Sequence, residues 1–515
     1  MKTKHILLGL SLGLLGGFTA CDVTDLNPKD SITDNSYWNT VSDLENYAKG
    51  FYMNLTGKGL RADGSENLDD LNTLDERSDN RLVASPDQWL FNEWVIPSEA
   101  NFDSKWYWNN IRNLNYFMTR YQRVNATESE VNPVVAVIRF FRAFDYFDKI
   151  KTFGDVPWYE KDLTTADIDE LYKARDDRDF VLGKIIEDLE FAIEWLPEKS
   201  AAEVGALHKD AARTFLARVC LHYGTYKKYH NVSTSPTSQE LLQKAATLAK
   251  EVMDSGLYDI VQGSDAGANQ SAFADYPLYY ANQFTQEDLT TNKECILARV
   301  FEADVLTHNL ARGGGVGLSK DFAESFLCKD GLPIANSSEY KGDETLDDEM
   351  ANRDPRMYQI IDSKYRPYTV KSNGMRVVNS GIDDKKEFSP SEEPGTNIHS
   401  APGLTGTATG YSPIKLVSAS QSQQDAVKTS SYDWFVFRYA EILLIYAEAK
   451  CELGECTQAV LDETINKLRD RVEMKHLTVS PVADLNPVDY GYSITPLLYE
   501  IPVSYTHLTL PTNSR

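Results

Sequence analysis

The feature that most constrains this 515-residue chain is a helical stripe of apolar residues that recurs towards both ends. Leu182, Ile185, Leu189 and Ile193 follow one another at spacings of three and four, which places them on one face of an α-helix. Ser42 with Glu45 has the S-x-x-E pattern of a capping box at a helix start. The same period runs through residues 44–55, 107–121, 137–151, 212–223 and 241–252. The sequence therefore predicts a series of amphipathic helices.

The last two predicted helices form a unit whose length indicates a known repeat. RYAEILLIYAEAKCELGE gives a helix that ends at Gly454, and TQAVLDETINKLRDRV gives its partner. Residues 439–472 span 34 positions, the period of a tetratricopeptide helix hairpin. Earlier pairs fit a loose stack: the two N-terminal helices, 134–153 with 179–196, and 208–226 with 238–256. We predict a mostly α fold, a tetratricopeptide-like helical scaffold over 36–256 and 431–480.

Residues 257–430 have a different character. Helical stripes nearly vanish there, and Gly, Ser, Asn, Pro and Tyr accumulate, as in GSDAGANQSAFADYPLYYANQF. A long irregular segment inside a compact protein is usually functional or disordered. Its aromatic residues favour folded binding loops, so we predict a loop-rich irregular insertion that carries a ligand region.

The first 20 residues resemble an export signal. Lys2 and Lys4 make a basic start, residues 6–18 are almost wholly apolar, and small residues precede Cys21. The apolar run is shorter than the about 20 residues that a bilayer-spanning helix needs. Since Cys21 stands where a bacterial lipoprotein carries acyl chains such as palmitate, we predict a lipoprotein signal peptide over 1–20 and a lipid anchor on Cys21. The alternative is an ordinary secreted protein with an incidental cysteine.

Charge and cysteine content exclude several classes of protein. The net charge of -25 disfavours nucleic acid and anionic lipid as partners. Besides Cys21 the chain has Cys220, Cys295, Cys328, Cys451 and Cys456, an odd number without CxxC spacing. Neither a disulfide framework nor a metal site is indicated, and no cofactor is expected.

No catalytic constellation stands out in the sequence. HExxH and GxSxG are absent, and GGGVG at 313–317 lacks the GK[ST] of a phosphate-binding loop. With 77 acidic residues, a carboxylate pair for glycoside hydrolysis could be proposed anywhere and would mean little. We therefore expect a non-enzymatic protein with no catalytic residues.

Aromatic residues are the compositional outlier, with 28 Tyr, 21 Phe and 8 Trp. Flat rings beside short polar side chains suit sugar binding. Residues 75–94 offer both, and we predict that Asp79, Asn80, Arg81, Trp89 and Trp94 bind ligand. Each tryptophan has an equal alternative in packing, because large aromatic residues are often mostly buried.

A second aromatic stretch, residues 273–284, contributes Tyr279 and Tyr280 to the predicted ligand site. Alternation along the chain sends these two side chains in opposite directions, so one of them is expected in the core. The remaining tryptophans lie on or beside predicted helices and are assigned to packing: Trp106, Trp108, Trp158, Trp195 and Trp434.

Several blocks of the chain resemble the SusD/RagB-type lipoproteins of the Bacteroidota. They are LNPKDSITDNSYWNTVSDLENYAKGFYMNL, FFRAFDYFDKIKTFGDVPWYE, DAARTFLARVCLHYG, CKDGLPI, RDPRMYQII, RYAEILLIYAEAKCELGE and INKLRDRV. Their order and spacing match the family from about residue 21 to 500. The resemblance implies a lipid-anchored protein on the outer face of the outer membrane, where it captures oligosaccharides and delivers them to a SusC-like TonB-dependent transporter. Asp22 and Asp25 fit the acidic export tag of such surface lipoproteins.

The chain departs from the family at its end. PVSYTHLTLPTNSR resembles a translated sequencing adaptor, so we expect residues 502–515 to be non-native and the SusD-like domain over 21–501 to be truncated. Two other functions stay open: a peptide- or protein-binding helical-repeat adaptor, and a surface glycoside hydrolase. The residues name neither the glycan nor the aromatics that face it.

Overall fold

The structure is a computed structural model. It describes residues 34–55, 80–82, 106–262, 277–303, 305–308, 317–363, 365, 369–370, 373, 376–379, 385–388, 409–424, 430–487, 489 and 491–501. The predicted signal peptide and the predicted non-native tail lie outside these residues.

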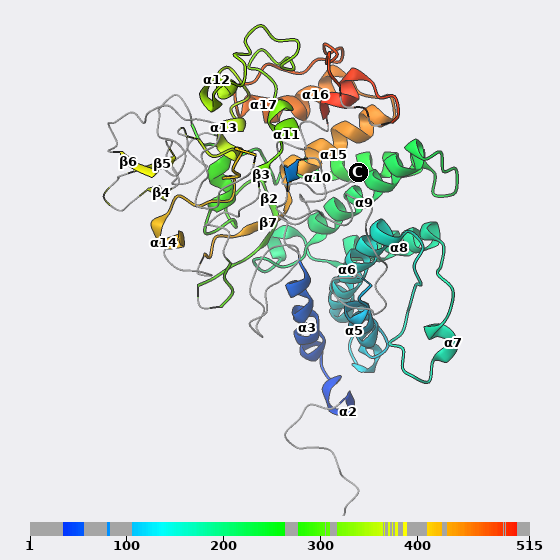
Figure 1. The fold of residues 1–515 in the computed structure, drawn as a ribbon. Coiled ribbons are helices and arrows are strands. Elements are labelled where there is room, and N and C mark those ends of the chain that lie inside the picture. The colour runs from blue at the N-terminus through cyan, green and yellow to red at the C-terminus, as the bar shows by residue number, and fades with distance from the viewer. Residues whose placement is uncertain are drawn as a thin grey trace, which may run out of the picture.

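Helices dominate the first half of the described chain (Figure 1). They are α2 (Asp34–Tyr37), α3 (Val41–Lys49), α5 (Asn109–Met118), α6 (Glu128–Phe153), α7 (Ile168–Leu171), α8 (Arg178–Trp195), α9 (Lys209–Tyr229) and α10 (Ser238–Asp254), with 3-10 turns η1 (Gly50–Asn54), η2 (Tyr121–Arg123) and η3 (Lys199–Ala201). Near the C-terminal end come α15 (Tyr439–Glu452), α16 (Gln458–Glu463) and α17 (Ile465–Asp470). The predicted mostly helical fold is confirmed.

The long helices pack as neighbouring pairs. α6 lies against α8, α9 against α10, and α10 also against α15, so helices far apart in sequence share one core (Figure 1). Residues of the predicted stripes fill this core, with Ile185, Leu216, Ala245 and Leu443 all at 0 % exposure. The predicted pairing of the central helices is confirmed, since each helix buries the face that its apolar period marks.

The two N-terminal helices depart from the prediction in detail. Both α3 and α5 pack against α6, and they meet each other through the stacked rings of Tyr47 and Tyr116. The capping box of α3 is formed by Thr40 and Asp43, whereas the sequence pattern pointed to Ser42 and Glu45. The helix begins two residues earlier than that pattern indicates, because Thr40 takes the extended N-cap conformation at φ -131°.

The C-terminal hairpin differs from its prediction twice. Its second helix is not continuous, because Thr464, at φ -128° and ψ -92°, separates α16 from α17. Cys451 and Cys456 form a disulfide, whereas the odd cysteine count gave no sign of one. α15 ends and the chain reverses through Gly454 at φ 74°, which brings the two cysteines together.

Short elements make up the region between α10 and α15. They are η5 (Ala281–Thr285), β2 (Cys295–Arg299), β3 (Gly317–Leu318), α11 (Lys320–Glu324), α12 (Leu346–Met350), α13 (Met357–Ile360), β4 (Thr369–Val370), β5 (Arg376–Asn379), β6 (Lys385–Phe388), α14 (Gln421–Gln424) and β7 (Trp434–Arg438). β3 pairs with β1 (Arg81–Leu82), β4, β5 and β6 form an antiparallel sheet, and β2 pairs antiparallel with β7. Since β7 runs directly into α15, the β2–β7 ladder joins this region to the helical stack.

Within the described part of the chain, no helix combines the length and the apolar character needed to cross a bilayer.

Candidate functional site

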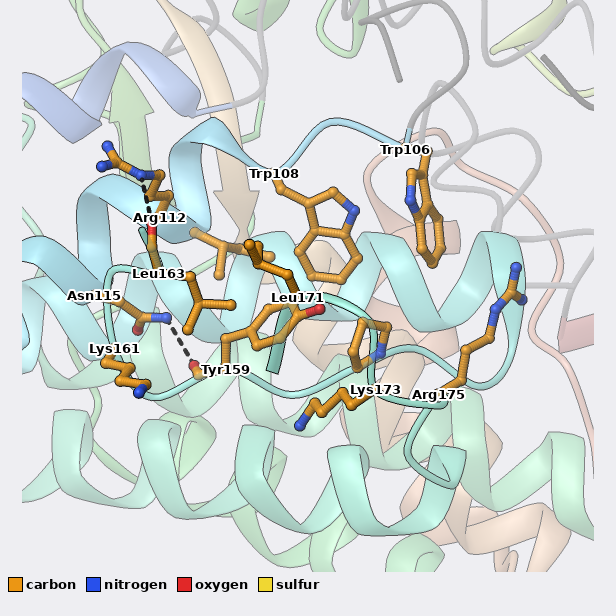
Figure 2. A pocket seen from close by; sticks show the side chains of 12 residues that line it. Trp106, Trp108, Arg112, Asn115, Tyr159, Lys161, Leu163, Leu171, Lys173 and Arg175 are labelled. Carbon is orange, nitrogen blue, oxygen red and sulfur yellow. Dashed lines mark hydrogen bonds between the residues drawn. The ribbon is translucent and has the colours of Figure 1, made fainter. Parts of the chain in front are cut away.

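A pocket of about 420 Å³ opens between the start of α5 and the connection from α6 to α8 (Figure 2). Its lining residues are Trp106, Trp108, Ile111, Arg112, Asn115, Pro157, Tyr159, Lys161, Leu163, Leu171, Lys173 and Arg175. We call it the aromatic pocket. Volumes of a few hundred Å³ are typical of small-ligand sites.

Three rings form one wall of the aromatic pocket. Trp108 is the N-cap residue of α5, and its ring lies 5.1 Å from that of Trp106 and 5.5 Å from that of Tyr159, edge to face in both cases. The ammonium of Lys149 lies 4.8 Å above the Trp108 ring and donates a hydrogen bond to the carbonyl of Tyr107 at 2.6 Å. These contacts hold the indole rings in place while each ring stays partly exposed.

Buried polar side chains fix the backbone of Tyr159. The Asn115 amide, at 0 % exposure, donates to the Tyr159 carbonyl at 2.7 Å, and the Tyr146 hydroxyl accepts from the Tyr159 N–H at 2.8 Å. Asn115 is in turn held by Arg142, whose guanidinium makes two hydrogen bonds with Asp188 of α8, at 2.7 and 2.8 Å. A pocket wall anchored in this way is preorganised, which lowers the entropic cost of binding.

The chemistry of the pocket suits binding. The described residues of its lining comprise three aromatic rings, one buried amide, four cationic side chains and four apolar residues, with no Asp or Glu among them. In the described part of the chain, no cluster of His, Cys, Asp and Glu side chains could hold a metal ion. Burial raises the pKa of Tyr159, with Glu170 and Asp176 adding to the effect, so the phenol stays neutral at physiological pH.

The predicted ligand residues of the 75–94 stretch fall only partly within the structure. Asp79, Trp89, Trp94 and the predicted anchor Cys21 lie outside the described residues. The backbone carbonyl of Asn80 accepts from the Ser319 N–H at 2.9 Å, and Arg81 pairs with Leu318 in the β1–β3 ladder. Their part in ligand binding stays a prediction.

The two predicted tyrosines have different environments. Tyr279 is 37 % exposed, whereas Tyr280 is 0 % exposed and packs its ring against Phe284, with the Lys415 ammonium 5.1 Å away. Burial raises the pKa of Tyr280 to about 12. A ring without accessible surface has no face to offer a ligand, so the prediction for Tyr280 is wrong and Tyr279 alone remains.

Hydrogen bonds link β3, the partner strand of Arg81 and Leu82, to other segments of the loop-rich region. The links are the Leu318 N–H to the Tyr411 carbonyl (2.8 Å), the Asp362 N–H to the Ser412 carbonyl (2.8 Å) and the Tyr358 hydroxyl to the Pro277 carbonyl (2.7 Å). Residues 411–412 and 358–362 therefore connect β3 with the backbone at Pro277.

Sequence reasoning missed the aromatic pocket. Trp158 and Trp434 are buried, as their assignment to packing predicts, but Trp106 and Trp108 line the pocket as well as packing against the core. The sequence did contain an indication of this pocket. Residues 106–108, WYW, stand immediately before the first turn of α5, where an aromatic side chain need not belong to the apolar face of the helix.

A sequence model described as the SusD family matches residues 263–486, and one described as starch-binding associating with outer membrane matches residues 27–221. SusD-like protein P2 from Formosa agariphila is 23 % identical over 499 residues, which cover 93 % of this chain and 83 % of that protein.

Solved structures share the fold. A SusD-like protein from Bacteroides fragilis superimposes with a TM-score of 0.63 at 22 % identity, covering 93 % of this chain and 86 % of its own. A SusD-like carbohydrate binding protein from the same species gives a TM-score of 0.64 at 20 % identity, over 92 % and 85 % of the two chains. With two family models matching separate parts of its length and a relative matching nearly all of it, the chain belongs to the SusD/RagB family.

Proposed function

We propose that this protein binds oligosaccharides at the outer face of the outer membrane and delivers them, uncleaved, to a SusC-like TonB-dependent transporter. The observation that carries the proposal is the aromatic pocket, in which Trp106, Trp108 and Tyr159 present partly exposed rings in a cavity of about 420 Å³. Sugar rings stack their C–H faces on such aromatic surfaces, and neighbouring polar groups meet the hydroxyls.

Family membership supports the location and the ligand class. One matching family model is described as starch-binding associating with outer membrane, and one structural relative is named a carbohydrate binding protein. The lipid anchor on Cys21 and the transporter partner rest on the sequence resemblance.

Asn80, Arg81 and Tyr279 are proposed as further contacts for a long glycan. Tyr279 is 37 % exposed, so its ring is available to stack on a sugar. Stacking with a few hydrogen bonds gives dissociation constants in the mM to μM range, about -4 to -8 kcal/mol. Such affinity suits transient capture before import.

The lining of the aromatic pocket supports binding without cleavage. A glycoside hydrolase uses two carboxyl groups about 5 to 9.5 Å apart on either side of the scissile bond. Among the described residues, no Asp or Glu lines the pocket. The polar groups there can hold a sugar, and they do not provide the pair of carboxyl groups that this mechanism uses.

Gel affinity electrophoresis of the purified protein against plant, host-mucin and microbial polysaccharides tests the proposal. We expect retention by at least one glycan, a loss of about tenfold in affinity for Trp108→Ala, and no change for Tyr172→Ala. Tyr172 is a suitable control because it lies one residue from the pocket-lining Leu171, is 85 % exposed and does not line the pocket.

Thermal melting of both variants separates a binding defect from a folding defect, and Trp106→Ala provides a second test of the same wall. Retention by none of the glycans, or equal retention of Trp108→Ala, Trp106→Ala and the unmodified protein, would refute binding at this pocket. Shortening of the glycan during incubation would instead identify a hydrolase.

A further inference from the structure

The aromatic pocket has a charge opposite to that of the rest of the molecule. The chain carries a net charge of -25, yet the described residues that line the pocket include Arg112, Lys161, Lys173 and Arg175 and no acidic residue. A local excess of positive charge on an acidic protein raises the local concentration of anionic ligands. It also distinguishes this pocket from a site built for neutral sugars alone.

Carboxylates outside the lining neutralise the two lysines. The Lys161 ammonium lies 2.7 Å from a carboxylate oxygen of Asp167, and the Lys173 ammonium lies 2.9 Å from one of Asp176 and 3.9 Å from one of Glu170. Hydrogen bonds from Lys161 and from Thr164 lower the pKa of Asp167 to about 2, so this carboxylate is ionised at any physiological pH. The lysines therefore add little net charge.

The two arginines are not neutralised in this way. In the part of the chain that the structure describes, the Arg112 guanidinium contacts the Leu163 carbonyl at 3.4 Å and forms no ion pair. The Arg175 guanidinium contacts the Asp155 carbonyl at 3.4 Å and lies 4.9 Å from the centre of the Trp106 ring. Contacts to carbonyl oxygens at that distance are weak and leave most guanidinium N–H groups available.

The positions of the two arginines place their positive charge near the aromatic rings of the pocket. Figure 2 shows Arg112 and Arg175 at opposite ends of the pocket, with Trp108 and Tyr159 between them and Trp106 towards the Arg175 end. An oligosaccharide that runs along the rings would therefore approach a guanidinium at either end. The planar fork of arginine matches the oxygen pairs of a carboxylate or a sulfate ester.

We propose that the aromatic pocket takes an acidic oligosaccharide, whose carboxylate or sulfate groups pair with Arg112 and Arg175 while its rings stack on Trp106 and Trp108. This inference rests on the proposed function, because it names the class of glycan for the same pocket. Neutral glycans gain only the stacking contribution and bind more weakly.

Two matched ligand pairs test the proposal by isothermal titration calorimetry. Trigalacturonic acid and its full methyl ester share the same sugar rings, and the ester has methyl groups in place of the carboxylate charges. A sulfated galactan oligosaccharide and its desulfated form share the same sugar backbone, and the desulfated form has hydroxyls in place of the sulfate esters. We expect at least one acidic member to bind about tenfold more tightly than its neutral partner, since a hydrogen bond to a charged group contributes about tenfold or more. The advantage should shrink at high salt, because the guanidiniums are exposed and screened.

Variants assign the effect to the two arginines. Arg112→Gln and Arg175→Gln should each lower affinity for the acidic member about tenfold and leave affinity for the neutral member unchanged. Lys341→Gln, which removes an exposed positive charge outside the pocket lining, should alter neither. Both arginines are exposed, so these variants are expected to fold, and thermal melting checks this.

The outcomes separate the two proposals. Equal affinity for the acidic and neutral members of both pairs, or loss of both on removing an arginine, overturns the acidic-ligand proposal. Binding of neutral glycans alone, lost in Trp108→Ala, overturns it while the proposed function stands. Absence of binding to any glycan overturns both.

Discussion

The Arg438 guanidinium donates a hydrogen bond to the Glu294 carboxylate at 2.8 Å, and both side chains are almost wholly buried. Arg471, also buried, forms an ion pair with the other oxygen of the same carboxylate. Glu294 precedes β2, Arg438 ends β7 and Arg471 follows α17. One carboxylate therefore ties the loop-rich region to the helical scaffold at two points.

Replacing Glu294 by Gln should destabilise the protein markedly. The change leaves two buried guanidiniums facing each other without a counter-charge, which typically costs about 3–5 kcal/mol. We expect a clearly lower midpoint in urea unfolding followed by circular dichroism. The control is Glu302→Gln, an exposed position in the same region, which should change stability by less than about 0.5 kcal/mol. Equal midpoints for the two variants would show that the ion pairs do not hold the regions together.

Alanine substitutions at two glycines in long helices should change the stability of the protein in opposite directions. A Cβ at Gly224 in α9 would lie 2.8 Å from the Leu242 side chain and 3.2 Å from its backbone nitrogen, where α9 and α10 approach closely. A Cβ at Gly183 in α8 would have no atom within 4 Å. Gly183→Ala should therefore stabilise by about 0.5–1 kcal/mol through helix propensity, whereas Gly224→Ala should destabilise by about 1–3 kcal/mol through overpacking.

Thermal melting of the two glycine variants side by side measures this difference directly. Both substitutions reduce the entropy of the unfolded chain alike, so their difference isolates the helix contact. A stabilised Gly224→Ala would mean that α10 moves away from α9 at negligible cost.

His308 should make stability depend on pH in the mildly acidic range. Its ring contacts Phe301 and Tyr432, its Nε2 lies 2.9 Å from the Tyr432 carbonyl, and burial lowers its pKa from 6.5 to about 4. The unfolded chain therefore takes up a proton at a pH where folded His308 stays neutral. Stability is unaffected above about pH 6.5, falls as the pH drops from there to about 4, and loses about 3 kcal/mol in total.

The comparison with His308→Gln tests this linkage. Glutamine does not titrate, so the variant is expected to be less stable at neutral pH and to lose less stability on acidification. Other groups titrate in both proteins and cancel in the difference, including His208, whose pKa burial also lowers. A stability gap between the two proteins that stays constant from pH 7 to pH 4 would contradict the assignment to His308.

The central helices could be predicted from the sequence because the apolar pattern that defines each helix is local. Leu182, Ile185 and Leu189 mark one face, and Gly154 and Pro197 mark ends, so the stripe alone indicates which face is buried. Helix ends carry less information. Thr40 and Ser42 both suit an N-cap, and the choice between them depends on where the chain enters the structure.

The exposure of individual aromatic residues could not be predicted from the sequence. Tyr279 and Tyr280 are neighbours of the same type in one loop, yet one is exposed and the other has no accessible surface. Trp106 and Trp108 both precede α5 and both pack against the core. They line a pocket only because the α6–α8 connection lies close to them. The odd number of cysteines likewise gave no indication of the Cys451–Cys456 disulfide, which the turn at Gly454 makes possible.

The helical scaffold and the regions of the chain that differ from it could be predicted from the sequence, because a hydrophobic period acts over a few turns and needs no distant partner. The family could be predicted as well, from blocks spread along the whole chain. Which rings meet solvent, and which guanidiniums have no carboxylate partner among the described residues, depends on the packing of distant segments, because residues such as Tyr159 and Arg175 reach the start of α5 from a separate connection.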